Sequence, residues 1–88
     1  MNRLIDVVSE LREKDPWTRD ISFETWLPKY LEECIELKNA VMRDDTQNMQ
    51  EEIGDVLFHL VLLCDVHNID INESIKGIVA KMQERHLV

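Results

Sequence analysis

The chain has 88 residues, enough for one domain, which we expect to span residues 1–88. Its net charge of −8 argues against nucleic acid as a partner, because phosphate-backbone binding depends on Lys and Arg. No apolar run reaches the roughly 18 residues of a membrane span, and the N-terminus lacks the basic-then-apolar pattern of a secretion signal. Cys34 and Cys64 fall in apolar helical patterns without a CxxC motif, so we expect a cytoplasmic protein with reduced, buried thiols.

The first two helices are predicted from apolar periodicity and from helix-ending residues. The first covers about Asn2–Lys14 and ends at Asp15-Pro16. The second runs from Ser22, a suitable N-cap, to Met42 or Arg43. Because proline cannot donate a backbone hydrogen bond, Pro28 predicts either a kink or a short turn before a helix that restarts there.

Two further helices follow. The third covers about Asn48–Val66 and is apolar nearly all round from Val56 to Cys64, which predicts a central helix that buries several of these side chains. The fourth begins at Asp70, with Glu73 three residues on, and reaches about His86. Its apolar stripe consists of Ile71, Ile75, Ile78, Val79 and Met82. Short loops and the absence of strand patterns predict an all-α, four-helix domain. Because a small chain can bury a shared apolar face between copies, we expect oligomerisation to complete it.

Carboxylate pairs occupy both central helices. Glu33 and Glu36 are three residues apart, as are Glu52 and Asp55, and this spacing places each pair on one helix face. The short connection at residues 43–47 predicts antiparallel neighbours, which could bring the pairs face to face at the edge of the core. The alternative is that both pairs are ordinary solvated surface charges.

Converging carboxylates favour a divalent cation. Two like charges 6 Å apart cost about 2.8 kcal/mol at an effective dielectric constant of 20, so four would repel one another strongly. Carboxylate oxygens without His or Cys at ligand spacing favour Mg²⁺ or Mn²⁺, and magnesium commonly takes substrate phosphates as further ligands. Gly54 lies within the second pair and costs roughly 1 kcal/mol relative to alanine. We expect the close approach of another helix or a ligand to compensate.

Several other side chains are candidates for binding or for packing. Lys81 and Arg85 share a helix face suited to phosphate, although cations also stabilise a helix C-terminus. Trp17 and Trp26 could each stack on a base or could simply pack in the core. His59 is expected to be a packed, hydrogen-bonded core histidine. Glu32 and Glu51 remain open as water-polarising groups or as surface charges.

Three stretches together resemble a known family. DPWTRDISFETWLPKYLEECIELKNAV, EEIGDVLFHLVLL and IVAKMQERH are similar to the MazG nucleotide pyrophosphohydrolases of the all-α NTP pyrophosphatase superfamily, over about residues 15–86. The central signature is ExxE, a spacer, and ExxD. It is met here by Glu33 to Glu36, fifteen residues, and Glu52 to Asp55.

The resemblance implies a function. Mg²⁺, with Mn²⁺ as a substitute, would be held by Glu33, Glu36, Glu52 and Asp55. Phosphates of a nucleoside triphosphate would contact Lys81 and Arg85, with Trp17 of the Pro-Trp segment as a further substrate-binding candidate. The implied reaction cleaves the α–β phosphate bond to a monophosphate and pyrophosphate, in the upkeep of the nucleotide pool. Glu32 is then our first candidate for orienting the attacking water. The resemblance also implies a homodimer or homotetramer, with the site near the subunit interface.

Three alternatives remain open. EEIGDVLFHLVLL fits phosphoribosyl-ATP pyrophosphohydrolases nearly as well, although the Pro-Trp segment and the KMQERH tail favour MazG. A four-helix protein with two redox metals would need two Glu-x-x-His pairs, and the sequence has none. A non-catalytic acidic module that binds a basic partner would need no metal, so EDTA would leave its stability and binding unchanged.

Overall fold

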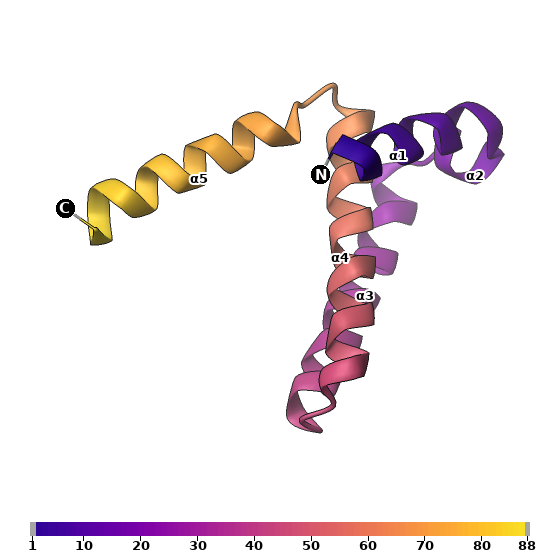
Figure 1. Cartoon of the computed structure of the whole chain (residues 1–88). Helices are drawn as coiled ribbons and strands as arrows, with labels where there is room; N and C mark the ends of the chain where they lie inside the picture. The colour runs from indigo at the N-terminus through magenta and orange to yellow at the C-terminus, as the bar shows by residue number, and fades with distance from the viewer. Residues whose placement is uncertain (1, 88) are drawn as a thin grey trace.

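The computed structural model describes residues 2–87, and every regular element in that range is an α-helix. Figure 1 shows a long hairpin, a pair of short helices across one end of it, and a last helix that points away. The elements are α1 (Asn2–Lys14), α2 (Pro16–Arg19), α3 (Phe23–Met42), α4 (Thr46–Val66) and α5 (Ile71–His86). The all-α prediction is therefore confirmed.

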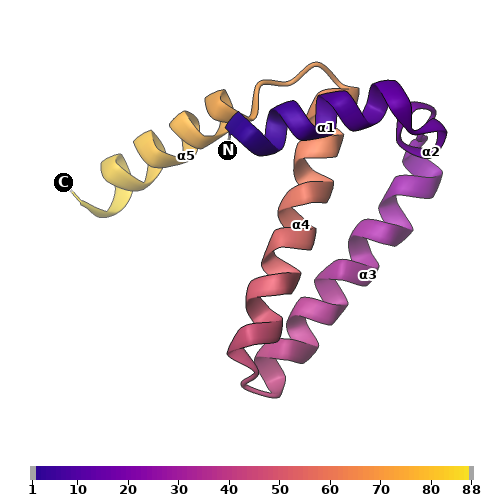
Figure 2. The ribbon, with the colours of Figure 1, turned by 45° about the vertical axis from the view of Figure 1, so that its right-hand side comes forward.

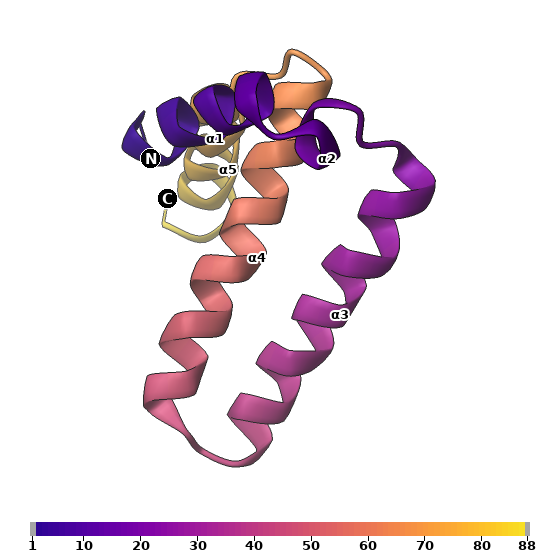
Figure 3. The same ribbon diagram turned by 90° about the vertical axis from the view of Figure 1, so that its right-hand side faces the viewer.

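Helices α3 and α4 form the antiparallel hairpin that the short connection predicted (Figure 3). The turn between them places Asp44 in the left-handed region at φ 55°, and Asp45 then caps α4 by accepting a hydrogen bond from the Asn48 amide at 3.1 Å. Because Asp45 is the cap, α4 begins at Thr46, slightly before the predicted start near Asn48.

One prediction about the proline residues is confirmed and one needs correction. Asp15-Pro16 ends α1 as expected, but the chain then forms the short helix α2, which Asp15 caps through the Thr18 amide at 3.0 Å. Pro28 does not restart a helix, because α3 is continuous across it. Its missing N–H removes a single hydrogen bond in the second turn, and the capping box between Ser22 and Thr25 fixes the helix start upstream.

The core is small and lies where α1 crosses α3 and α4, at the end of the hairpin away from the Asp44 turn (Figure 2). Its buried members are Val8, Trp26, Val61 and Leu62. Helix α4 is central as predicted, but less enclosed: Val56 and Leu60 are half-buried and Leu57 is 36% exposed. Cys34 and Cys64 are free thiols and half-buried rather than buried.

Arg12 ties α1 and α2 to α4. Its guanidinium pairs with Asp65 at 2.8 Å, and it also donates to the carbonyl oxygens of Thr18 at 3.1 Å and Arg19 at 3.3 Å. Both partners of the ion pair are largely covered, so water screens it less than an exposed pair.

Replacing Arg12 with alanine is therefore expected to lower the free energy of unfolding by about 1–3 kcal/mol, since it leaves Asp65 and two carbonyls without a donor. The matched control is Lys14→Ala, which breaks an exposed pair with Glu10 and should cost less than about 1 kcal/mol. Urea unfolding followed by circular dichroism measures both. Equal losses would contradict the structural role given to Arg12.

Among residues 2–87 the structure has five helices, because α2 adds one to the four expected, and α5 does not pack along the hairpin of the same copy. It leaves the end of α4 and runs away from the hairpin (Figures 1 and 2). Its apolar stripe is consequently exposed, with Ile78 48% and Val79 49% accessible. Within residues 2–87, no helix combines the length and the apolar content needed to cross a bilayer.

Candidate metal centre

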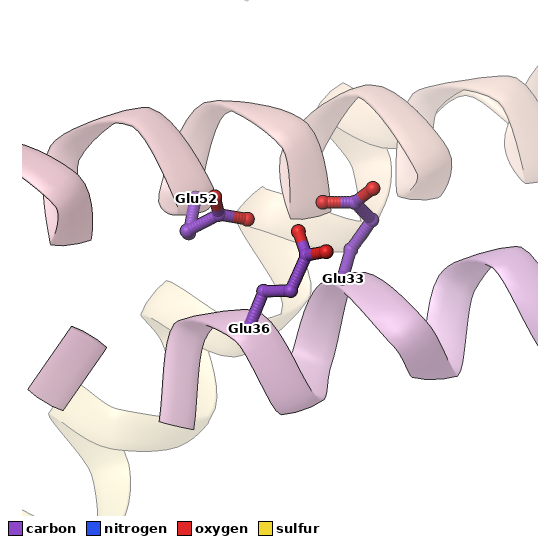
Figure 4. A group of neighbouring side chains, drawn as sticks. All are labelled: Glu33, Glu36 and Glu52. Atoms are coloured by element: carbon purple, nitrogen blue, oxygen red, sulfur yellow. The ribbon is translucent and has the colours of Figure 1, made fainter. Parts of the chain in front are cut away.

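Three of the four predicted acidic ligands converge between the two hairpin helices. Glu33 and Glu36 project from α3 and Glu52 from α4, and one carboxylate oxygen of each lies within 4.8 Å of the others. Figure 4 shows the three side chains pointing into the space between the two ribbons. The i, i+3 spacing puts the first two on one face, and the short turn sets α4 opposite them.

The other acidic candidates lie outside this group of three. Asp55 is exposed on the next turn of α4, close enough for its charge to act on Glu33, but it does not join the group within 4.8 Å. Glu32 and Glu51 are exposed on α3 and α4. The structure therefore assembles a three-carboxylate group with Asp55 beside it.

The donor set fits a hard divalent cation. One oxygen of Glu33 and one of Glu52 are buried and have no hydrogen-bond partner among the described residues. A buried carboxylate oxygen without a donor is costly, and a cation between the two helices would satisfy both. Three carboxylates without His or Cys favour a hard divalent cation over zinc.

The pKa values of the carboxyl groups also reflect their burial and mutual repulsion. Burial, the adjoining Glu52 carboxyl and the charges of Glu36 and Asp55 raise the pKa of Glu33 from 4.5 to about 7. Burial is also the main reason that the pKa of Glu52 is raised. Without a cation, the group therefore retains a proton near neutral pH. Binding of a divalent ion would displace that proton.

The surroundings differ from the prediction. Leu31, Ile35 and Ile53 near the acids are about half exposed, so this part of the hairpin is not at the edge of the core in a single chain. A methyl group at Gly54 would meet nothing within 4 Å, so no other helix within residues 2–87 approaches it closely. Among these residues, the close helix contact expected to compensate for this glycine is absent.

The variant Gly54→Ala tests whether the helix surface at this position is free or is contacted by a second copy or a ligand. If nothing approaches Gly54, alanine should raise the free energy of unfolding by about 1 kcal/mol, because glycine is a poor helix former. Gly77→Ala, on α5 and equally uncrowded, is the control. Thermal unfolding of both variants measures the effect. Destabilisation by Gly54→Ala alone would show that a second copy or a ligand approaches this position.

The predicted phosphate and base contacts are not brought to the carboxylates within one chain. Lys81 and Arg85 are exposed on α5, which points away from the hairpin (Figure 1). Trp17 is 44% exposed on α2, at the end of α3 away from the acidic group (Figure 2). A single chain therefore forms the carboxylate group but does not bring Lys81, Arg85 or Trp17 to it.

Trp26 and His59, whose roles the sequence left open, are both buried and are joined by a hydrogen bond. Trp26 is buried, stacks on Tyr30 at 4.9 Å between ring centroids, and donates from its indole to the His59 carbonyl at 3.1 Å. His59, one turn beyond Asp55, is 8% exposed as predicted, but its Nδ1 has no hydrogen-bond partner among the described residues. Burial is the main cause that lowers its pKa. Its i+4 spacing from Asp55 is the sequence signal that places it beside the acids.

Comparison with known proteins identifies relatives of this chain. Residues 21–87 match the family model of the MazG nucleotide pyrophosphohydrolase domain. The nucleoside triphosphate pyrophosphohydrolase of Escherichia coli K12 is 30% identical over 93 residues, which is 98% of this chain and 35% of that protein. The nucleoside triphosphate pyrophosphohydrolase/pyrophosphatase MazG of Thermotoga maritima is 30% identical over 89 residues, with 94% of this chain and 35% of the relative covered.

A solved structure extends the likeness to three dimensions. The crystal structure of a MazG-related protein from Thermotoga maritima matches with a TM-score of 0.77 and 31% identity, covering 97% of this chain and 78% of that one. The chain spans about a third of the length of the two curated relatives. The family match covers most of the chain, and the chain belongs to the MazG nucleotide pyrophosphohydrolase family.

Proposed function

We propose that this domain hydrolyses nucleoside triphosphates, ribo- or deoxyribo-, between the α- and β-phosphates to a nucleoside monophosphate and pyrophosphate, with Mg²⁺ as cofactor. The observation that carries the proposal is the group formed by Glu33, Glu36 and Glu52, with two buried oxygens that have no donor. Membership of a pyrophosphohydrolase family supports the reaction type. Both curated relatives are named as enzymes that act on nucleoside triphosphates.

Each residue of the site would have a distinct role in the proposed reaction. Glu33, Glu36 and Glu52 would hold the cation, and Asp55, beside them, would join on binding. When bound, the cation would neutralise phosphate charge and lower the pKa of a water molecule. Glu32, exposed one position before Glu33, is our candidate for orienting that water. Lys81 and Arg85 would bind the polyphosphate, and Trp17 is the candidate for contacting the base.

The test is pyrophosphate release from a panel of dNTPs, NTPs and phosphoribosyl-ATP, with Mg²⁺, with Mn²⁺ and with EDTA. We expect metal-dependent release together with an equimolar monophosphate. A preference for phosphoribosyl-ATP would favour the histidine-pathway alternative. No release from any substrate, together with thermal stability that EDTA does not change, would favour the non-catalytic acidic module.

A homodimer or homotetramer is part of the proposal. The chain leaves large apolar side chains exposed on α3, α4 and α5, including Leu31, Ile35, Ile53, Ile78 and Val79. Such a surface is unusual for a stable monomer and is typical of an interface. Sedimentation velocity would test it, and a monomer at micromolar concentration would contradict it.

A further inference from the structure

His59 is a buried side chain that the proposed reaction does not use. It lies on α4 one turn after Asp55, is 8% exposed, and its Nδ1 has no hydrogen-bond partner among residues 2–87. A buried polar atom without a partner is destabilising, and native structures contain few of them. A partner that arrives only when the neighbouring site binds its cation would account for this atom.

The side chain of His59 is directed toward the carboxylates. In an α-helix each Cα–Cβ bond tilts toward the N-terminus, so a long side chain covers the turn before its own. For His59 that turn carries Asp55, four residues earlier on the same helix face. Burial lowers the pKa of His59, and the charge of Asp55 opposes this shift, as expected of close neighbours. The two side chains are therefore placed to interact.

Contacts with both hairpin helices fix the position of His59. The indole of Trp26 on α3 donates to the His59 carbonyl at 3.1 Å, and the indole ring stacks on Tyr30. On α4, the ring of Phe58 meets the imidazole edge to face, with 5.3 Å between the ring centroids. The backbone at His59 is thus held against α3, one turn beyond Asp55. A side chain on such a support can hold a neighbouring ligand in one orientation.

Asp55 is the member of the predicted ligand set that needs such orientation. It is exposed, and its carboxylate lies outside the group that Glu33, Glu36 and Glu52 form within 4.8 Å. To bind the same cation, Asp55 must turn from solvent into the space between the two helices (Figure 4). Carboxylates that bind a metal are usually held by a hydrogen bond from a neighbouring group.

We propose that His59 is a positioning residue for Asp55. When Asp55 turns inward to join the cation, the Nδ1–H of a neutral His59 donates to the carboxylate oxygen of Asp55 that does not bind the cation. This hydrogen bond gives the buried nitrogen its partner and holds Asp55 in its ligand orientation. The inference rests on the proposed function and extends it, because it adds a residue that touches neither the cation nor the substrate.

Lys29 on α3 is the other charged group that acts on the imidazole. An ammonium group can only donate, so pairing with Lys29 would require Nδ1 to be an acceptor and would leave Asp55 without its donor. Lys29 is exposed, and a cation at the carboxylate group would repel it, whereas the same cation attracts Asp55. Asp55 is therefore the partner that binding of the cation brings to Nδ1.

Binding of Mn²⁺ to the full chain, measured by isothermal titration calorimetry, tests the inference without reference to turnover. His59→Leu should weaken binding by about 10–100-fold, as is typical when a group that orients a metal ligand is lost. Its Tm in EDTA should not fall, because leucine removes an unpaired polar atom from a buried position. Unchanged Mn²⁺ binding in His59→Leu would overturn the inference.

Two amide variants decide the question even if His59→Leu does not fold. His59→Asn places an amide N–H where Nδ1 lies and should bind Mn²⁺ within about threefold of wild type. His59→Gln places its amide one bond further out and should bind about as weakly as His59→Leu is expected to. Equal binding in the two amide variants would overturn the role given to Nδ1.

A double variant shows whether the effect of His59 passes through Asp55. In an Asp55→Ala background, adding His59→Leu should change Mn²⁺ binding by less than about twofold, because the group that His59 orients is already gone. A further loss as large as that in the wild-type background would overturn the inference. Lys29→Met is the control for the other charged neighbour and should bind Mn²⁺ at least as tightly as wild type. Weakening equal to that of His59→Leu would make Lys29 the partner instead.

The same measurements separate this inference from the proposed function. A wild type that binds no Mn²⁺ would refute the cation site and the role of His59 together. A wild type that binds Mn²⁺ and responds to His59→Leu as predicted, but hydrolyses no nucleoside triphosphate, would refute the proposed reaction alone. In an active chain, His59→Leu should raise the Mg²⁺ concentration needed for half-maximal rate and leave kcat at saturating Mg²⁺ within about threefold of wild type.

Discussion

Replacing Glu36 with glutamine is expected to lower kcat/KM for pyrophosphate release by at least about 100-fold and to leave the helical fold intact. Glu36 contributes one of the three oxygens that lie within 4.8 Å of one another, and glutamine keeps the shape while it removes the charge. Because Glu36 is exposed, the core at the other end of the hairpin does not depend on it. Steady-state kinetics across Mg²⁺ concentrations would show whether excess metal partly restores the rate, as expected for a weakened cation site.

Glu24→Gln is the matched control for this variant. Glu24 is an exposed glutamate in the first turn of the same helix, away from the acidic group. The kcat/KM of Glu24→Gln should therefore stay within about twofold of wild type. Unchanged activity in Glu36→Gln would remove the carboxylate group from the reaction. Loss of helical signal in Glu36→Gln, but not in Glu24→Gln, would indicate that the group holds the hairpin together rather than acting on substrate.

The metal-free chain is expected to lose stability as the pH rises from about 4.5 to about 7. The unfolded chain releases the Glu33 proton near its ordinary pKa of 4.5, whereas the folded chain keeps it until about pH 7. Across that interval the folded state binds more protons, so the free energy of unfolding falls with pH and becomes level above it. The raised pKa of Glu52 acts in the same direction.

Urea unfolding in EDTA from pH 4 to pH 8 measures this slope, and two comparisons assign it. Glu33→Gln should flatten most of the slope and make the metal-free protein more stable at pH 8, because it removes the buried charge. Mg²⁺ should stabilise the wild type at pH 8 and stabilise Glu33→Gln less, since the ionised carboxylate is a ligand. A slope that survives in Glu33→Gln, or equal stabilisation by Mg²⁺ in both proteins, would contradict this account of the group.

The sequence was informative where local rules decide the structure. Apolar periodicity and the caps Ser22 and Asp70 predicted the long helices. The i, i+3 spacing with a short turn predicted that four carboxylates would converge, and three of them, Glu33, Glu36 and Glu52, lie together while Asp55 stays outside the group. The family resemblance came from the same residues together with the Pro-Trp and KMQERH segments, and it is confirmed.

The sequence was less informative where tertiary contacts decide. An apolar stripe predicts that its side chains are buried, but it does not indicate whether the same chain or another copy buries them. Leu57 and the α5 stripe were therefore assigned to a bundle that one copy does not form. The continuous passage of α3 through Pro28 and the short helix α2 depend on capping contacts of single residues, which periodicity does not resolve. The missing partner of His59 Nδ1 depends on packing that only coordinates reveal.

The most direct test of the central claim, that this carboxylate group supports attack by water on the α-phosphorus, is hydrolysis of a nucleoside triphosphate in H₂¹⁸O with Mg²⁺. Mass spectrometry of the products locates the label. We predict one ¹⁸O in the monophosphate, none in the pyrophosphate, and no turnover with EDTA or in Glu36→Gln. Label in the pyrophosphate, release of orthophosphate as the first product, or turnover that persists in EDTA would contradict the account.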